Sequence, residues 1–264
     1  MPRARRLQHA HALGDHFAAD AVAGDDGDAM FFHGGQYIES AMVFAAFETS
    51  SEWCSVALCR RGEIRALERR AGHRHSELAL PMLERLLADA GVAAAQLDAV
   101  AFGAGPGSFT GLRIACALAQ GLALARDLPL LGVSSLEAIA QESGAARVVA
   151  CVDARMREVY YAALEKDGTP QFPRWREVIS TRCIAPQAAP RPPGRDWLGA
   201  GNGFAVYGNF GLSRVLPEVH PTAFAVAELA APRLAAGEGV DAAAAAPMYV
   251  RDKVAFTREE LAAR

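Results

Sequence analysis

The chain has 264 residues, which is enough for one large domain or for two lobes that each bury a core. Hydrophobic residues make up 52% of it and charged residues 22%, the composition of an ordinary globular protein. Its 27 basic and 30 acidic side chains leave a formal net charge of −3, which excludes attraction to nucleic acid through overall charge, so any RNA contact would be local or shared with a partner.

The N-terminal segment, residues 1–41, is rich in histidine, aspartate and alanine and sustains neither helical nor strand periodicity. It also lacks the apolar stretch of a secretory signal peptide. Because Met42 directly precedes a clear strand pattern, folding is expected to begin there. We therefore interpret residues 1–41 as a disordered extension or as an over-long gene start.

The folded part begins with a strand pattern at Met42 that runs into an acid, Glu48, then a polar turn and a second strand at residues 54–58. This order predicts a hairpin with a carboxylate at its tip. Residues 76–90 place apolar side chains at helical spacing, which predicts an amphipathic helix. A buried strand then enters the glycine-rich stretch FGAGPGSFTGLR, and a long helix is expected over residues 108–125.

The second half of the chain begins in the same way as the first. An apolar strand at residues 148–152 is followed by Asp153, a short polar turn and an alternating strand at residues 159–164. A repeated unit of this kind is expected from two similar lobes that face a cleft. We therefore predict one lobe at residues 42–146 and a second at residues 147–264.

The glycine loop has the residue types of a phosphate cradle. Gly105 and Gly107 would let the backbone approach a ligand, and the helix that begins near Ser108 would favour an anion. The loop has no lysine, however, and its spacing matches neither the phosphate-loop motif nor the dinucleotide-binding motif. Phosphate binding therefore stays open at this point, and Ser108 is better suited to cap the helix than to act as a nucleophile.

The helix after the loop carries a stripe of small side chains, in which Gly111, Ala115 and Ala119 are spaced four residues apart. Such a stripe lets another backbone come close. Packing on the chain's own sheet would explain it, and so would contact with a helix of a second protein.

Glu48 and Asp153 occupy corresponding positions in the two halves, where a carboxylate could hold Mg²⁺ or orient water. An acid at a turn can equally satisfy nearby backbone N–H groups. His73 and His75 are two residues apart, which is not the spacing of a metal pair on a helix, so no metal site is predicted.

The five cysteines are widely spaced and four lie in apolar segments, which suits buried thiols in a reducing compartment. The apolar run at residues 114–125 is interrupted by Gln120 and is shorter than the about 20 residues that span a bilayer. We therefore expect a cytoplasmic protein without a membrane segment.

Six segments resemble, in chain order, the TsaB (YeaZ) family, which is needed to make N6-threonylcarbamoyladenosine at position 37 of tRNA. The segments are FETSSEWCSVAL, HSELALPMLERLL, FGAGPGSFTGLRIACALAQGLAL, LPLLGVSSLEAIA, CVDARMREVYYA and PMYVRDKVA. The resemblance runs from about Met42 to about Ala255, and the runs GPGSFTGLR and DARMREVY are specific.

This resemblance implies an α/β protein with a two-lobed actin-like or Hsp70-like (ASKHA) fold, each lobe being a mixed sheet with packed helices. It also implies a non-catalytic subunit that heterodimerises with a TsaD-like catalytic subunit, is joined by a TsaE-like ATPase, and meets tRNA through the complex. ATP and a divalent metal are expected in the partner subunits, and no cofactor on the chain itself. A homodimer is an open alternative when the chain is alone.

The resemblance further implies two sets of site residues. The family's dimer contact uses the first amphipathic helix and the helix after the glycine loop, which gives Leu78, Met82, Leu86, Gly111, Leu112, Ala115, Ala119 and Leu122. A vestigial nucleotide site would comprise Glu48, Gly105, Gly107, Ser108, Asp153, Gly201 and Gly203. The chain departs from the family in two ways, since Glu48 replaces the usual aspartate and residues 1–41 have no counterpart.

The alternative hypothesis is an active enzyme of the same fold, either an ATP-dependent kinase or a metallopeptidase-like enzyme. A kinase would bind nucleotide between the lobes, with Glu48 or Asp153 acting on Mg²⁺. The catalytic TsaD subunit carries a His-x-x-x-His metal pair, which this sequence lacks, so the non-catalytic subunit is favoured.

Overall fold

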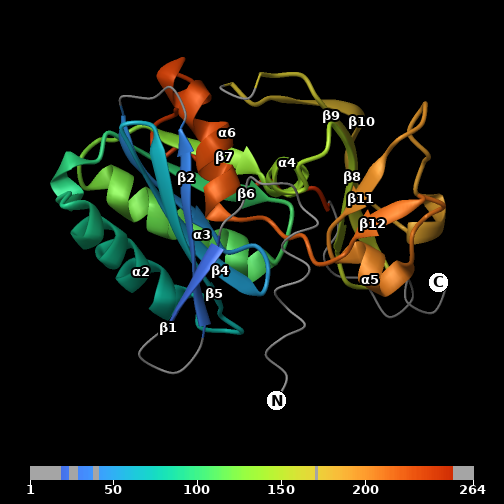
Figure 1. Ribbon diagram of the computed structural model, residues 1–264, viewed down its shortest axis with the longest axis horizontal. Helices are drawn as coiled ribbons and strands as arrows, with labels where there is room; N and C mark the ends of the chain where they lie inside the picture. The colour runs from blue at the N-terminus through green and yellow to red at the C-terminus, as the bar shows by residue number, and fades with distance from the viewer. Residues whose placement is uncertain (1–18, 24–28, 38–41, 170–171, 252–264) are drawn as a thin grey trace.

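A computed structural model describes residues 19–23, 29–37, 42–169 and 172–251 of the chain. Two sheets form its framework, one in each half of the molecule (Figure 1). The seven-stranded sheet has the order β1-β2-β5-β4-β3-β6-β7. Its strands are β1 (Ala19–Ala23), β2 (Ala29–Tyr37), β3 (Val43–Glu48), β4 (Trp53–Arg60), β5 (Glu63–Arg70), β6 (Ala99–Gly105) and β7 (Leu130–Ser134).

The five-stranded sheet of the second lobe has the order β10-β9-β8-β11-β12. It consists of β8 (Arg147–Asp153), β9 (Val159–Lys166), β10 (Trp175–Ile184), β11 (Leu198–Ala200) and β12 (Arg214–Leu216). The short helix α5 (Gly203–Tyr207) packs on β8, and single 3₁₀ turns lie at η1 (Ala94–Gln96) and η2 (Pro186–Ala188).

Helices cover both faces of the first sheet. On one face, α2 (His75–Ala90) and α3 (Phe109–Leu124) pack on inward side chains of β3, β4 and β6. On the other, α6 (Ala223–Ala235) packs on the alternate residues of the same strands, and α4 (Ser135–Glu142) lies between this face and the second sheet. Because both faces are covered, these strands are apolar along nearly their whole length.

The two lobes repeat one arrangement of strands, which confirms the two-lobed α/β fold. Strands β5, β4 and β3 are antiparallel neighbours, and β6 and β7 follow in parallel. Strands β10, β9 and β8 are likewise antiparallel, with β11 and β12 following in parallel. The repeated strand, acid, turn and strand in the sequence therefore marks the centre of each sheet.

Two features differ from the sequence-based expectation. Within the N-terminal segment, β1 and β2 form a hairpin that pairs with β5 and widens the first sheet, whereas no regular structure was expected there. In addition, α6 belongs by sequence to the predicted second lobe but packs on the first sheet, since that sheet's second apolar face needs a cover. No helix in the described part of the chain is long and apolar enough to cross a membrane.

Candidate functional site at the interlobe cleft

A cleft of about 960 Å³ lies between the lobes and takes its walls from both. The first lobe contributes the turn after β3 and the start of α3, and the second contributes the turn after β8 and residues 217–221. Residues 248–251 form part of the wall as well. Of the residues predicted for a vestigial nucleotide site, Gly107, Ser108 and Asp153 line this cleft, whereas Glu48, Gly105, Gly201 and Gly203 are not among its lining residues.

Glu48 is enclosed by its own chain. Its Oε1 accepts a hydrogen bond from the backbone N–H of Ser50 at 2.6 Å, and its Oε2 accepts one from Ser135 Oγ at 3.0 Å. A Cβ atom at Gly103 would lie 1.8 Å from Glu48 Oε2, so the glycine makes room for this carboxylate. Burial raises the pKa of Glu48 above its usual value. The carboxylate therefore satisfies the turn and the start of α4, and it does not face the cleft.

The glycine loop is packed against neighbouring backbone. Ser108 N–H donates to Ser50 O at 2.8 Å, and Gly111 N–H donates to Ser108 Oγ at 3.3 Å, so Ser108 caps α3 as expected. A Cβ atom at Gly107 would lie 2.8 Å from Ser50 O, and one at Gly105, whose φ is +110°, would lie 3.2 Å from Met248 O. The donors of Ser108 and Gly111, which a phosphate would use, are thus engaged within the chain.

The small-residue stripe on α3 faces the chain's own sheet. Ala115 and Ala119 are fully buried, and a Cβ atom at Gly111 would lie 1.9 Å from Thr49 O. Thr49 Oγ1 donates to Gly111 O at 2.7 Å, which fixes this close approach. Of the two explanations for the stripe, this burial favours packing on the chain's own sheet. Leu78, Met82, Leu86 and Leu112 of the predicted interface set are buried as well, and Leu122 is half-buried.

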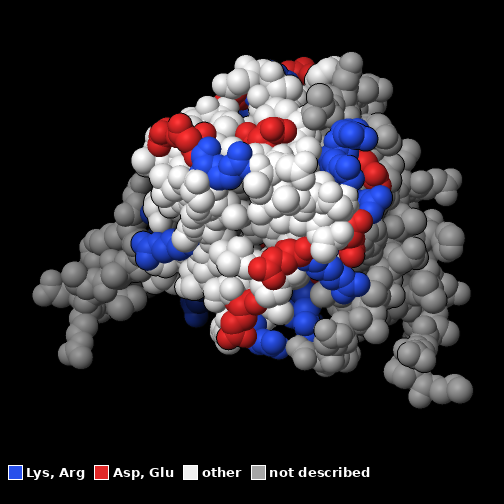
Figure 2. Space-filling model, turned by 90° about the vertical axis from the view of Figure 1, so that its left-hand side faces the viewer, with Lys and Arg blue, Asp and Glu red and all other residues white. Residues whose placement is uncertain are grey.

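The outward faces of α2 and α3 carry different residues from those predicted. Leu80 on α2 is 41% exposed and Leu124 on α3 is 64% exposed. Ala117 and Gly121, which are also on α3, are exposed as well. Figure 2, which looks at the side where α2 lies in Figure 1, shows a broad area without charged side chains, bordered by acidic and basic ones.

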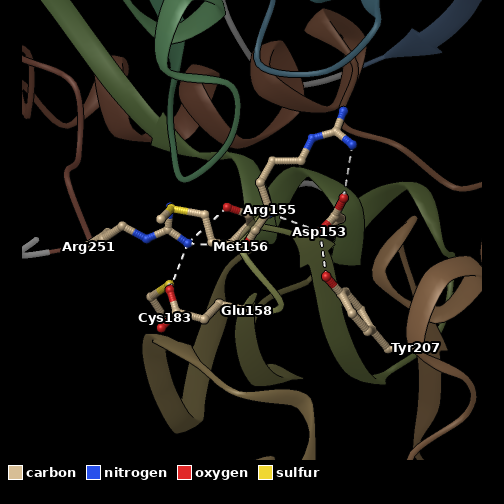
Figure 3. A network of polar contacts seen from close by, with 8 residues as sticks. Asp153, Arg155, Met156, Glu158, Cys183, Tyr207 and Arg251 are labelled. Carbon is tan, nitrogen blue, oxygen red and sulfur yellow. Dashed lines mark hydrogen bonds and ion pairs between the residues drawn. The ribbon is translucent and has the colours of Figure 1, made fainter. Parts of the chain in front are cut away.

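Asp153 ends β8 and organises the turn beside the cleft (Figure 3). Its Oδ1 accepts hydrogen bonds from Arg155 N–H at 2.9 Å and from Tyr207 Oη at 3.0 Å, and Arg155 Nη1 lies 3.3 Å from its Oδ2. A Cβ atom at Gly201 would lie 2.3 Å from Cys151 O, and one at Gly203 2.4 Å from Cys151 Sγ. These glycines bring the start of α5 close to β8.

Residues 247–251, which we call the strap, connect the two lobes across the cleft. At the first lobe, Met248 N–H donates to Ala104 O at 2.7 Å, and Tyr249 packs on Phe109 with ring centroids 6.0 Å apart. At the second lobe, Arg251 Nη2 donates to Ala154 O at 2.9 Å and to Glu158 Oε2 at 2.8 Å (Figure 3).

The turn that Arg251 holds is unusual, because Arg155, Met156 and Arg157 all have left-handed φ values between 54° and 61°. The motif PMYVRDK was noted in the sequence, but these contacts join positions nearly 100 residues apart and leave no local signal.

A second feature that sequence reasoning missed is the environment of His220. Its Nε2 lies 3.0 Å from Glu68 Oε1 and its ring stacks on Trp53 at 4.9 Å. Burial alone would lower the pKa of His220, but the hydrogen bond and charge of Glu68 outweigh it and raise that pKa to about 9. The raised pKa favours the protonated form of His220, which lies at the wall of the cleft. Among the described residues, no three His, Cys, Asp or Glu side chains gather so that they could hold a metal ion.

Comparison with known proteins gives consistent matches over most of the chain. The family model described as "TsaD: tRNA N6-adenosine threonylcarbamoyltransferase" matches residues 69–256. The tRNA threonylcarbamoyladenosine biosynthesis protein TsaB of Haemophilus influenzae is 36% identical over 228 residues, which cover 82% of this chain and 97% of that protein. The Escherichia coli protein of the same name is 33% identical, with 82% of this chain and 98% of that protein covered.

Among solved structures, YeaZ from Pseudomonas aeruginosa is similar to this chain with a TM-score of 0.74 and 38% sequence identity. The superposition covers 79% of this chain and 99% of that one. Since the relatives match over almost their whole length, the likeness extends to both lobes.

Proposed function

Because this chain belongs to the TsaB family of tRNA threonylcarbamoyladenosine biosynthesis proteins, we propose that it is the non-catalytic subunit required for N6-threonylcarbamoyladenosine formation at tRNA adenosine 37. In this role it heterodimerises with a TsaD-like catalytic subunit in the cytoplasm, and a TsaE-like ATPase joins the pair. ATP and the divalent metal belong to the partner subunits.

The observation that carries the proposal is the match to TsaB proteins over nearly their entire length. The state of the candidate nucleotide site supports the non-catalytic role. Both oxygens of Glu48 are hydrogen-bonded within the chain, and two of the donors at the start of α3, the N–H groups of Ser108 and Gly111, bond to Ser50 O and Ser108 Oγ. A productive Mg-nucleotide would have to displace these bonds, each of which contributes about 1 kcal/mol.

The partner surface that fits this role is the outward face of α2 and α3. On α3 this face exposes Ala117, Gly121 and Leu124 without a charged side chain among them, and on α2 it exposes Leu80 between the acids Glu77 and Glu84. An apolar centre with a charged border is expected of a protein interface. The buried stripe on the opposite face of α3 lets this helix pack close to the sheet, which fixes the position of the outward face. A second copy of the chain could use the same face in the absence of the partner.

Reconstitution of tRNA modification tests the proposal. The TsaD-like and TsaE-like proteins of the same organism, with threonylcarbamoyl-adenylate and unmodified tRNA, should form the modified nucleoside only when this chain is added. Modification at the same rate without the chain would refute the proposal. Calorimetry with Mg-ATP on the isolated chain is the companion measurement, since tight binding with turnover would favour the kinase alternative.

A further inference from the structure

One edge of the second sheet presents a group of arginine side chains to solvent. The register sets Leu198 of β11 opposite both Val148 of β8 and Arg214 of β12, so these parallel strands begin at the same edge. Arg147 starts β8 and Arg214 starts β12, two strands away, so their Cα atoms are about 10 Å apart at the usual strand spacing. The register aligns Arg214 with Val148, so the side chains of Arg147 and Arg214 leave opposite faces of the sheet at this end. Asp153 ends β8 at the opposite edge, so the arginines lie away from the cleft.

The loop before β11 adds two more arginines to this edge. Arg147 Nη1 donates to Arg195 O at 3.4 Å, which sets the loop beside the start of β8. The guanidinium of Arg191 lies over Gly211, since a Cβ atom at Gly211 would be 2.5 Å from Arg191 Nη2. Gly211 is three residues before Arg214, so Arg191 lies near the start of β12. We refer to these residues as the arginine edge: Arg147, Arg191, Arg195 and Arg214.

The loop that carries Arg191 and Arg195 is held firmly by the sheet. Tyr161 Oη donates to Pro190 O at 2.6 Å, and Trp197 Nε1 donates to Pro193 O at 2.9 Å. Prolines at 190, 192 and 193 further restrict its backbone. The two arginines are therefore presented on a pre-organised loop, which lowers the entropy lost when they bind.

The charge of this edge is only partly balanced within the chain. Glu165 pairs with Arg147 at 2.8 Å, and Asp196 is an exposed acid in the loop itself. Arg191, Arg195 and Arg214 are exposed and form no ion pair with any residue that the structure describes. A local cationic surface thus exists on a protein whose net charge is −3.

We infer that the arginine edge contacts the phosphate backbone of the substrate tRNA. Guanidinium groups donate paired hydrogen bonds that match phosphate oxygens, and an array with few carboxylates attracts a polyanion. This inference rests on the proposed function, which puts the chain in a complex that acts on tRNA. It goes further, because the chain itself contributes affinity for tRNA through direct contact, independent of base sequence.

The test compares two triple variants of the full chain, alone and in the reconstituted complex with its TsaD-like partner. The first is Arg191→Gln/Arg195→Gln/Arg214→Gln. The matched control removes the same charge from exposed arginines elsewhere, as Arg61→Gln/Arg70→Gln/Arg182→Gln. Binding of a fluorescein-labelled unmodified tRNA transcript is followed by anisotropy over a range of salt concentrations. Circular dichroism and gel filtration check folding and heterodimer formation.

The arginine-edge variant should bind tRNA at least about tenfold more weakly at physiological salt, and the slope of log K against log salt should become shallower by about two. The control should keep the wild-type affinity and slope. Equal binding by the arginine-edge variant overturns the inference, as does equal loss in the control. Loss of binding to polyglutamate without loss of binding to tRNA also overturns it and assigns the edge to an acidic protein.

Modification activity separates this inference from the proposed function. If the wild-type complex forms modified tRNA but the arginine-edge variant binds tRNA normally, only the inference fails. If the wild-type chain does not support modification, the proposed function fails, and the binding series on the isolated chain still tests the arginine edge.

Discussion

Gly103 and Gly111 each leave out a side chain where another part of the same chain comes close. At Gly103 the neighbour is the carboxylate of Glu48, and at Gly111 it is the carbonyl oxygen of Thr49. Both neighbours lie in the stretch that ends β3 and begins the following turn. Glycine at these positions therefore locks that turn against β6 and α3, which accounts for the glycine-rich sequence without a ligand.

The substitution Gly111→Ala should lower the free energy of unfolding by about 1 to 3 kcal/mol, because the new methyl group would overlap Thr49 O. Gly121→Ala in the same helix is the matched control, since a Cβ atom there meets nothing within 4 Å. Alanine should instead stabilise the helix at that position by about 0.5 to 1 kcal/mol. Urea unfolding should show a lower free energy of unfolding for Gly111→Ala and a higher one for Gly121→Ala. A Gly111→Ala protein more stable than the wild type would contradict the packing explanation.

Helix α3 has two faces with separate roles. The face with Ala115 and Ala119 is buried against the first sheet, and the face with Ala117 and Leu124 is open to solvent. The sequence showed the small-residue stripe, but not which face would turn inward, because apolar residues occupy most of the helix. The contact with Thr49 decides the orientation, and it depends on a residue 62 positions away.

The two faces predict opposite outcomes for the same substitution. Ala115→Arg should prevent stable folding, because it forces a charged side chain into the core. Ala117→Arg should leave the unfolding midpoint almost unchanged and abolish co-purification with the TsaD-like partner, since the new charge would be buried at the interface. Gel filtration of the mixed proteins checks this. An intact heterodimer with Ala117→Arg would show that the partner binds a surface other than the outward face of α3.

At the scale of the whole molecule, the lobes are similar in design but not independent. Helix α6 returns from the second half of the chain to the first sheet, and the strap ties the cleft from the other side. A group of buried and partly buried ionisable side chains lies around α6. Glu228 accepts a hydrogen bond from Gln141 Nε2 at 3.1 Å, Glu142 accepts one from Thr222, and His220 pairs with Glu68.

This buried group predicts that stability decreases as pH rises. Burial raises the pKa of Glu142 to about 7 and that of Glu228 to about 8, and the pairing with Glu68 raises that of His220 to about 9. Each group binds its proton more tightly in the folded state than in the unfolded state. The contribution of the two glutamates is therefore complete only below about pH 4.5 and is lost as the pH rises to about 7 and 8, whereas that of His220 is complete below about pH 6.5 and is lost as the pH rises to about 9.

Urea unfolding midpoints measured between these pH values check the prediction. Glu228→Gln should flatten the decline, because the amide can keep the contact with Gln141 and does not titrate. Glu84→Gln, at an exposed position on α2, should leave the decline unchanged. A midpoint that is constant with pH, or a decline that Glu228→Gln does not alter, would contradict the assignment.

Local patterns in the sequence predicted much of the framework. The bounds of α2 and α3 and the repeated strand, acid, turn and strand follow from periodicity and turn residues, and the structure confirms them within two residues. What the sequence did not predict depends on long-range contacts. The carboxylate of Glu48 turns to Ser135, 87 positions away, and His220 meets Glu68 across 152 positions. The edge pairing of β2 likewise depends on β5 having an unpaired side.

The return of α6 has a consequence for how the protein is made. A ribosome releases the chain from its N-terminal end, so β7 (Leu130–Ser134), the last strand of the first sheet, emerges long before α6 (Ala223–Ala235). Until then, the apolar face formed by Phe44, Ile64 and Leu131 has no cover. The first lobe therefore completes its folding only after the second has been synthesised, and a nascent chain stalled between the two would expose a surface that chaperones bind.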